Sequence, residues 1–541
     1  MEKMFCNQCE QTARGIGCTI CGVCSKEAVV ANTMDVLIYI LRQNALVALK
    51  AREEGIIDEK YDILTSNLLF STLTNVNFDE KRLVEYTKEA LQARQTLLSQ
   101  MKPQASKKEL ESSIEIEDCE KYIKENLDKK RPNQMNADKD IQSLMQAVLF
   151  GLKGVCAYIS HAYLLGEKNT DINTFIHQAL AAGYDNKERD LKAWIDLVKE
   201  TGKWNFETLK LLDKANCTLG NPTPTSVLLG HKKGKCILVS GHDLFDLKNI
   251  LEQTQNTGIN VYTHGEMLPA HGYPELKKYS NLVGHFGSAW QNQQRELLNF
   301  PGPVVFTSNC LMKPRPEYAE HTYTTNEVGY AGLNHIGSNK DFKVVIEKAL
   351  AMEGFQDDKK DGEVLTGFGH HALLETEITE KLVSYIKTGK IKGIYVVGGC
   401  DGVRKERNYY TEIARKIPKD SIILTCGCGK YKFFKEDLGE IDGIPRYIDC
   451  GQCNDSYTPF VVALKLAEIF KCGVNELPLH IYLSWYEQKA VCILLTVIYL
   501  GLKNVFYGPT KPAFLSENIC KYLKDEINLT INSTPDKDLK F

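Results

Sequence analysis

The N-terminal segment carries five cysteines within nineteen positions. Cys6 and Cys9 form a C-x2-C pair, and Cys18, Cys21 and Cys24 follow in a glycine-rich stretch. The turn of a C-x2-C pair points both thiolates toward one centre, and two of the later cysteines would complete a four-thiolate site. Glycines beside them let backbone amides approach the sulfurs. The spacing predicts a metal site. It leaves open an iron–sulfur cluster, a structural zinc ion or, least of all, buried cysteines without a metal.

A second set of metal-binding residue types follows seven short apolar runs farther along the chain. Each residue alone would more often be a hydrogen-bonded histidine, a small apolar cysteine or a solvated glutamate. Chance placement after all seven runs is improbable, and ligands of open parallel sheets bind beyond the carboxyl ends of the strands. The runs are 235–240, 258–262, 302–307, 393–397, 421–425, 446–448 and 479–483. The segments that follow them are 241–243 (GHD), 264–266 (HGE), 308–310 (SNC), 398–402 (GGCDG), 426–429 (CGCG), 449–453 (DCGQC) and 484–487 (SWYE).

These segments combine soft and hard ligands. Thiolates suit iron–sulfur chemistry, whereas carboxylates suit harder, oxygen-bridged metal. Both kinds on one centre predict a mixed sulfur–oxygen cluster with an open coordination position. That is a catalytic arrangement, because a pure electron carrier would normally be saturated by cysteines.

The elements that must position these residues fall into three regions. Periodic apolar patterns at 34–49, 81–98 and 141–165 predict helices, so residues 1–220 are expected to form a helical domain. The breaker Asn221-Pro222-Thr223-Pro224 marks the first boundary, and the charged, glycine-rich stretch 357–369 marks the second. Apolar runs alternating with amphipathic stretches predict two Rossmann-like, parallel-sheet α/β domains at 221–365 and 366–541.

Composition restricts the class of protein. The 541 residues carry a net charge of −3, which argues against nucleic-acid or membrane-surface binding. The N-terminus shows no apolar leader, and the longest apolar run, 490–502, is too short to cross a bilayer. These features predict a cytoplasmic protein, and in a reducing compartment clustered cysteines bind metal or do redox chemistry.

The motifs resemble those of the hybrid cluster proteins, also called prismane proteins or hydroxylamine reductases, over essentially the whole chain. The spacing Cys6-x2-Cys9-x8-Cys18-x5-Cys24 is similar to the anaerobe-type motif of that family, which accompanies a 4Fe-4S cluster. Cys21 departs from the pattern and is read as an extra cysteine. The long region 58–140 is similar to the full-length form. The seven strand-end segments, together with Lys430, Asn454, Asp455 and the run Ser484-Trp485-Tyr486-Glu487-Gln488-Lys489, look like the family's hybrid-cluster motifs.

The resemblance implies a ligand set for a hybrid 4Fe-2O-2S cluster at the junction of the three domains. The implied ligands are His242, Glu266, Cys310, Cys400, Cys428, Cys453 and Glu487. Cys400 matches the family's persulfide-bearing cysteine, whereas Cys426 and Cys450 are near neighbours and not expected ligands. Glu266, Glu487 and Lys489 are the candidates for proton delivery.

The implied activity is the two-electron reduction of hydroxylamine to ammonia and water, or of nitric oxide to nitrous oxide, with a role in nitrosative stress. An unidentified protein would donate the electrons. Two other functions stay open: a non-catalytic iron–sulfur protein that senses or scavenges nitric oxide, and a carbon monoxide dehydrogenase, which would need further N-terminal cysteines and nickel. A zinc-ribbon scaffold is a third alternative.

Overall fold

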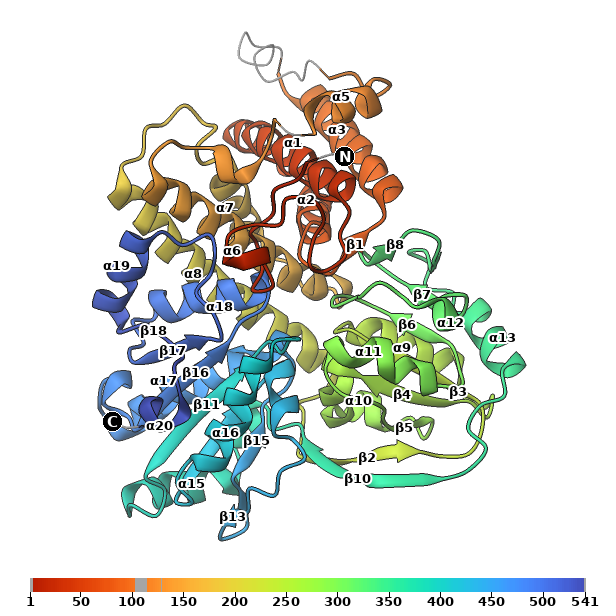
Figure 1. The fold of residues 1–541 in the computed structure, drawn as a ribbon, viewed down its shortest axis with the longest axis vertical. Coiled ribbons are helices and arrows are strands. Elements are labelled where there is room, and N and C mark those ends of the chain that lie inside the picture. Colours follow the sequence, from red (N-terminus) through yellow and green to blue (C-terminus); the bar gives the residue numbers. More distant parts are fainter. Residues whose placement is uncertain (1–2, 103–113, 128, 540–541) are drawn as a thin grey trace.

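The first 220 residues are mainly helical in the computed structural model, which describes residues 3–102, 114–127 and 129–539 (Figure 1). Part of the expected helical region, residues 103–113, lies outside these described residues. The three predicted helices are present and longer than their apolar patterns, because capping residues such as Asp79 and Asp138 begin them earlier. The helices are α1 (Ala28–Glu53), α2 (Glu59–Ser71), α3 (Glu80–Gln100), α5 (Cys119–Asn126), α6 (Lys139–Leu164), α7 (Thr170–Ala181) and α8 (Leu191–Asn216).

Helix α6 is the centre of this region. It is long and apolar enough to span a membrane by length and composition, with a mean hydropathy of 1.3, yet its apolar stretch is entirely buried. It packs against α2, α8 and α18 (Gln488–Tyr499), the helix predicted from the apolar run at 490–502. A Cβ on Gly202 of α8 would lie 2.0 Å from the backbone oxygen of Leu495, so glycine is required where α8 and α18 touch. Helix α6 is therefore the core helix that its all-round apolar pattern predicts.

Two larger sheets follow the helices. The first has eight strands in the order β10-β2-β5-β4-β3-β6-β7-β9, and the second has six parallel strands in the order β15-β12-β11-β16-β17-β18. The first comprises β2 (Thr225–His231), β3 (Cys236–Ser240), β4 (Asn260–His264), β5 (Leu282–His285), β6 (Val304–Phe306), β7 (Thr322–Thr324), β9 (Asn334–His335) and β10 (Lys359–Thr366). The second comprises β11 (Gly393–Gly399), β12 (Ser421–Thr425), β15 (Tyr447–Asp449), β16 (Leu479–Ser484), β17 (Val505–Gly508) and β18 (Thr530–Ile531).

Each of the seven predicted apolar runs is a strand, with ends shifted by at most two residues. The main helices that accompany the sheets are α9 (Leu244–Gln253), α13 (Lys343–Ala351), α15 (Glu377–Lys387), α16 (Asn408–Lys416), α17 (Tyr457–Phe470) and α19 (Glu517–Ile527). A short parallel pair, β1 (Asn77–Phe78) with β8 (Gly329–Tyr330), joins the helical region to the first sheet. This alternation of strands and helices is the one the sequence predicts.

The stretch at 357–369 differs from its prediction. We expected it to be a boundary, but residues 359–366 form β10, which pairs antiparallel with β2 at the edge of the first sheet. That sheet is therefore mixed, not purely parallel. Edge strands carry exposed charges, as Lys359, Lys360 and Glu363 do here, and this makes them resemble linkers in sequence. The chain moves toward the second sheet only after Thr366, and the domain limits themselves stay predictions.

Candidate metal centre

Seven side chains from the two sheets line one buried cavity. Three follow β3, β4 and β6 of the first sheet, and four follow β11, β12, β15 and β16 of the second, so the carboxyl ends of both sheets face this cavity. They are His242, Glu266, Cys310, Cys400, Cys428, Cys453 and Glu487, the ligand set that the resemblance of the sequence motifs implied. The structure thus brings together residues that span 246 positions of the chain, as counted from their numbers.

His242, Glu266 and Cys453 form the tightest part of the cavity. One potential ligand atom from each lies within 4.8 Å of the other two. The Nε2 atom of His242 is 3.2 Å from Sγ of Cys453 and 3.7 Å from Oε2 of Glu266. The other ring nitrogen, Nδ1, is 2.9 Å from the hydroxyl of Ser308. This hydroxyl fixes the orientation of the ring and leaves Nε2 directed at the thiol and the carboxylate, as second-shell partners do for ligating histidines.

The two glutamates are buried, and within the part of the chain that the structure describes neither forms an ion pair with a lysine or an arginine, although Lys430 and Lys489 lie near enough to lower their pKa values. Oε2 of Glu266 accepts a hydrogen bond of 2.7 Å from the backbone N–H of Cys453. Its Oε1 is buried and has no hydrogen-bond partner in the described part of the chain. Glu487 caps α18, because its carboxylate accepts a 2.8 Å bond from the N–H of Lys489. Burial raises the pKa of Glu266 and raises that of Glu487 to about 7. A bound metal would supply the missing positive charge.

The cavity raises the pKa values of its thiols as it raises those of the two glutamates. Burial, together with the nearby carboxylate of Glu487, raises the pKa of Cys400 to about 12. Burial and the charge of Glu487 likewise hold the pKa of Cys310 well above its usual range. Thiols become thiolates in such surroundings when a metal binds, because its charge offsets the lost hydration. The donor set of four thiols, one imidazole and two carboxyls therefore fits an iron centre with both sulfur and oxygen ligands.

Glycine allows the strand ends to approach this centre. Gly399 has a φ of +103°, and a Cβ there would lie 2.1 Å from the backbone oxygen of Ser484. The next residue, Cys400, donates a backbone hydrogen bond of 2.7 Å to the same oxygen. Only glycine combines this backbone conformation with so close a contact. The glycines that flank the candidate ligands in the sequence are thus explained by backbone crowding at the cavity.

The N-terminal cysteines form a separate cluster. Cys6 and Cys18 are joined by two backbone hydrogen bonds of 3.1 and 2.9 Å. Burial holds the pKa of Cys9 well above its usual range, and the nearby thiols of Cys24, Cys6 and Cys18 raise it further. These effects show that Cys9 lies near the other three thiols, and a shared metal centre stays a prediction. Cys21 is exposed, and its interpretation as an extra cysteine stays a prediction.

One backbone contact connects the two groups of cysteines. Glu10, which follows Cys9, donates an N–H hydrogen bond of 2.9 Å to the carbonyl of Tyr486, which precedes Glu487. The Tyr486 ring is fully buried and stacks on Trp290 with ring centroids 4.5 Å apart. Both aromatic residues line the cavity of the seven candidate ligands. The two sites are therefore separated by a short, packed stretch of protein.

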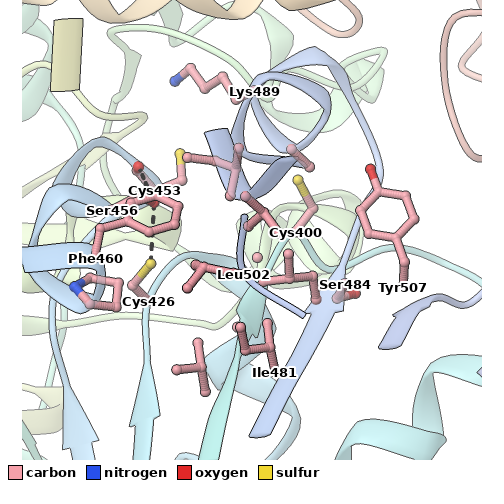
Figure 2. Close-up of a pocket in the computed structure, with 18 of the residues that line it drawn as sticks. Cys400, Cys426, Cys453, Ser456, Phe460, Ile481, Ser484, Lys489, Leu502 and Tyr507 are labelled. Atoms are coloured by element: carbon pink, nitrogen blue, oxygen red, sulfur yellow. Dashed lines mark hydrogen bonds between the residues drawn. The ribbon is translucent and has the colours of Figure 1, made fainter. Parts of the chain in front are cut away.

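A neighbouring apolar cavity adjoins the candidate centre. Figure 2 shows Cys400 and Cys453 at this cavity, together with apolar side chains such as Phe460 and Ile481. Cys426 also lines it and lies 3.4 Å from the hydroxyl of Ser456. Among the described residues, neither Cys426 nor Cys450 lines the cavity of the seven, and that neither is a ligand stays a prediction. Lys489 lines the apolar cavity, and its Nζ donates a 3.2 Å hydrogen bond to Oδ1 of Asn454.

Sequence reasoning did not identify His161. This residue of α6 is buried, and its ring centroid is 6.2 Å from that of His242. Neither of its ring nitrogens has a hydrogen-bond partner among the residues that the structure describes. Its helix is apolar on most faces, and the one histidine of that helix was the available signal. A histidine with two unsatisfied nitrogens next to a candidate ligand belongs to the environment of the centre.

Comparison with known proteins shows the family to which the chain belongs. The family model described as the prismane/CO dehydrogenase family matches residues 4–540. The chain belongs to this family. Its curated relatives include the "Hydroxylamine reductase" of Syntrophobacter fumaroxidans, 45% identical, and that of Solidesulfovibrio magneticus, 47% identical, each covering 99% of both chains. Among solved structures, carbon monoxide dehydrogenase IV from Carboxydothermus hydrogenoformans matches this prismane-family chain with a TM-score of 0.57 and 16% identity. It covers 98% of this chain and 91% of the other, which shows a shared fold.

Proposed function

We propose that this prismane-family protein is an iron–sulfur reductase that converts hydroxylamine, with two electrons and two protons, to ammonia and water. Reduction of nitric oxide to nitrous oxide is a second reaction of the same kind. The observation that carries the proposal is the buried cavity lined by four thiols, one imidazole and two carboxyls. Relatives with 44–47% identity that are named hydroxylamine reductase support it, and they are far nearer than the carbon monoxide dehydrogenases at 14–16%.

In this proposal the chain holds two cofactors. Cys6, Cys9, Cys18 and Cys24 hold a 4Fe-4S cluster, and the seven cavity residues hold a hybrid 4Fe-2O-2S cluster, with Cys400 as the persulfide-bearing cysteine. When bound, the clusters supply electrons and a Lewis-acidic iron that polarises the N–O bond. His242 is oriented for this role by Ser308, and Glu266 offers an unpartnered carboxylate oxygen.

Other residues exclude water from the cavity, connect the two sites or could deliver protons. The stacked rings of Trp290 and Tyr486 close one side of the cavity to water. The N–H of Glu10 and the carbonyl of Tyr486 provide a short bonded route between the two sites. Glu266, Glu487 and Lys489 are the candidates for proton delivery. Lys489 holds its ammonium group against Asn454, the residue after Cys453. We propose a cytoplasmic protein that takes electrons from a donor protein and binds neither nucleic acid nor membrane.

Anaerobic purification followed by iron and sulfide analysis and electron paramagnetic resonance tests the cofactors. Two distinct cluster signals are expected, and a spectrum with a single cubane would contradict the hybrid centre. Turnover with excess hydroxylamine and reduced methyl viologen tests the reaction. An enzyme continues to form ammonia, whereas a nitric oxide scavenger stops after about one equivalent. Carbon monoxide oxidation, assayed with the same preparation, is expected to be absent.

A further inference from the structure

The loop that carries the N-terminal cysteines exposes three apolar side chains. Ile16, Ile20 and Val23 are 68%, 64% and 54% exposed. They lie in an eight-residue stretch that also contains Cys18, and Cys24 follows directly. Large exposed apolar side chains gathered over a functional site, and rimmed by polar ones, are typical of interaction surfaces. We call these three residues the apolar patch.

The backbone under the apolar patch is well supported. The N–H of Met4 bonds the carbonyl of Thr19 at 3.1 Å, and that of Gly22 bonds the carbonyl of Lys26 at 2.8 Å. A Cβ on Gly17 would lie 2.4 Å from the Phe5 ring, so the loop lies tightly on the segment before it. The patch is therefore presented on a fixed backbone, which lowers the entropy cost of binding a partner.

Positive charges lie on, or contact, the N-terminal segment that carries the apolar patch. Lys3 and Arg14 are exposed on the same segment, whose one exposed carboxylate among residues 3–27 is that of Glu27. Arg404, whose side chain is partly exposed, pairs with the buried carboxylate of Glu10, which the fully buried Arg407 also contacts. Arg131 donates a 3.0 Å hydrogen bond to the carbonyl of Lys3 and adds another charge. The rim is basic, although the whole chain has a net charge of −3.

We propose that the apolar patch and its basic rim are the docking surface for a small, acidic, one-electron carrier protein of the iron–sulfur type. This inference rests on the proposed function, because the carrier would reduce the cluster held by the cysteines beneath the patch. Cys24 is only half-buried there, so a docked carrier comes close to the cluster. An apolar centre with complementary charges at the rim gives orientation and fast association without a large contact area.

A second copy of the chain fits this surface less well. A two-fold contact would place two identical basic rims against each other, and like charges at an interface are unfavourable. An acidic partner replaces that repulsion with attraction. The charge of the rim therefore favours the carrier over self-association.

The test compares two electron donors on the complete, anaerobically loaded protein. The probes are a reduced bacterial ferredoxin with a strongly acidic surface and reduced methyl viologen. In the triple variant I16S/I20S/V23S we expect the KM for ferredoxin to rise about tenfold, while viologen-driven turnover stays within about twofold of the wild type. The control V344S/L350S changes exposed apolar residues of α13, at 50% and 46% exposure, and should leave both donors unaffected.

Arg14→Glu is the second variant, in case the triple variant loses its cluster. It should raise the KM for ferredoxin several-fold at low salt, and the difference should shrink as salt rises. Unchanged ferredoxin kinetics in both variants would overturn the docking surface, as would a wild type that acidic ferredoxin neither binds nor reduces, or that dimerises through the patch. If the wild type does not reduce hydroxylamine with reduced viologen, the proposed function is refuted instead. Ferredoxin binding, measured by calorimetry, would then still test the docking surface.

Discussion

The cysteine loop and the strand-end cavity assemble their candidate ligands in opposite ways. The loop takes four cysteines from positions 6–24, close to the surface, with Cys21 and the apolar patch exposed beside them. The cavity takes seven residues from positions 242–487, at the ends of strands from two sheets. Four of them are buried, and Cys310, Cys400 and Cys453 are half-buried. A local motif can form near solvent and receive electrons from a partner. A centre that does chemistry on a small molecule needs a water-poor enclosure, which only distant segments can provide.

Glu487→Gln should have the largest effect and should separate the two regions. The substitution keeps the shape of the side chain but removes the anionic ligand from the cavity. We expect hydroxylamine turnover to fall by more than about 100-fold, with iron only partly lost and the N-terminal cluster intact. Activity assays with electron paramagnetic resonance measure both. Glu317→Gln, which changes an exposed glutamate, is the control. Near-normal turnover of Glu487→Gln with an unchanged hybrid-cluster signal would mean that Glu487 serves only as a helix cap.

Cys9→Ser should damage the other region. Loss of one thiolate should abolish delivery of electrons from a protein donor, while the hybrid cluster still forms and accepts electrons slowly from a chemical donor. Cys21→Ser is the matched control. Because Cys21 is exposed, this variant should leave the paramagnetic resonance signal of the N-terminal cluster unchanged. If Cys9→Ser eliminates the hybrid cluster itself, the two regions are not independent.

Two glycine substitutions compare the packing of the regions. Gly399→Ala would place a methyl group 2.1 Å from the backbone oxygen of Ser484, so the strand ends must shift and turnover should drop by about 100-fold. Gly15 has a φ of +68° but open space around it. For Gly15→Ala we therefore expect only a backbone strain of about 1 kcal/mol and a slightly lower unfolding temperature. Equal effects of the two substitutions on turnover would contradict the difference in crowding.

Lys26→Met should change only the potential of the N-terminal cluster. The Lys26 ammonium is buried, donates a 3.0 Å hydrogen bond to the carbonyl of Asn77 and lies near the thiols of Cys24, Cys6 and Cys9. Removing one positive charge disfavours the more negative reduced cluster by about 1–2 kcal/mol, so its midpoint potential should fall by tens of millivolts. A redox titration followed by electron paramagnetic resonance measures this shift. Lys192→Met on the exposed face of α8 should cause none, and an unshifted potential in Lys26→Met would show that the lysine charge is screened.

Much of this arrangement could be predicted because its signals are local. Short apolar runs between breakers indicated seven strands, and their ends marked the candidate cavity. Strand β10 could not be recognised, because its exposed, charged residues are those of an edge strand and of a linker alike. His161 could not be recognised either, because only the packing of α6 beside the strand ends brings it to His242.

The sequence by itself determined which chemistry is present: the cysteine spacing at 6–24, the glycines, and a metal-binding residue type after each strand. It left open which member of each segment serves. The tertiary structure shows which members of these segments line the cavity. His264 is held by Ser240 at 2.9 Å and by Glu296 at 3.2 Å, whereas His242 faces the cavity. Cys428 lines that cavity, but Cys426 faces the apolar one. Spacing along a chain fixes which residues are neighbours, but the direction of a side chain beyond a strand end depends on loops packed against other elements.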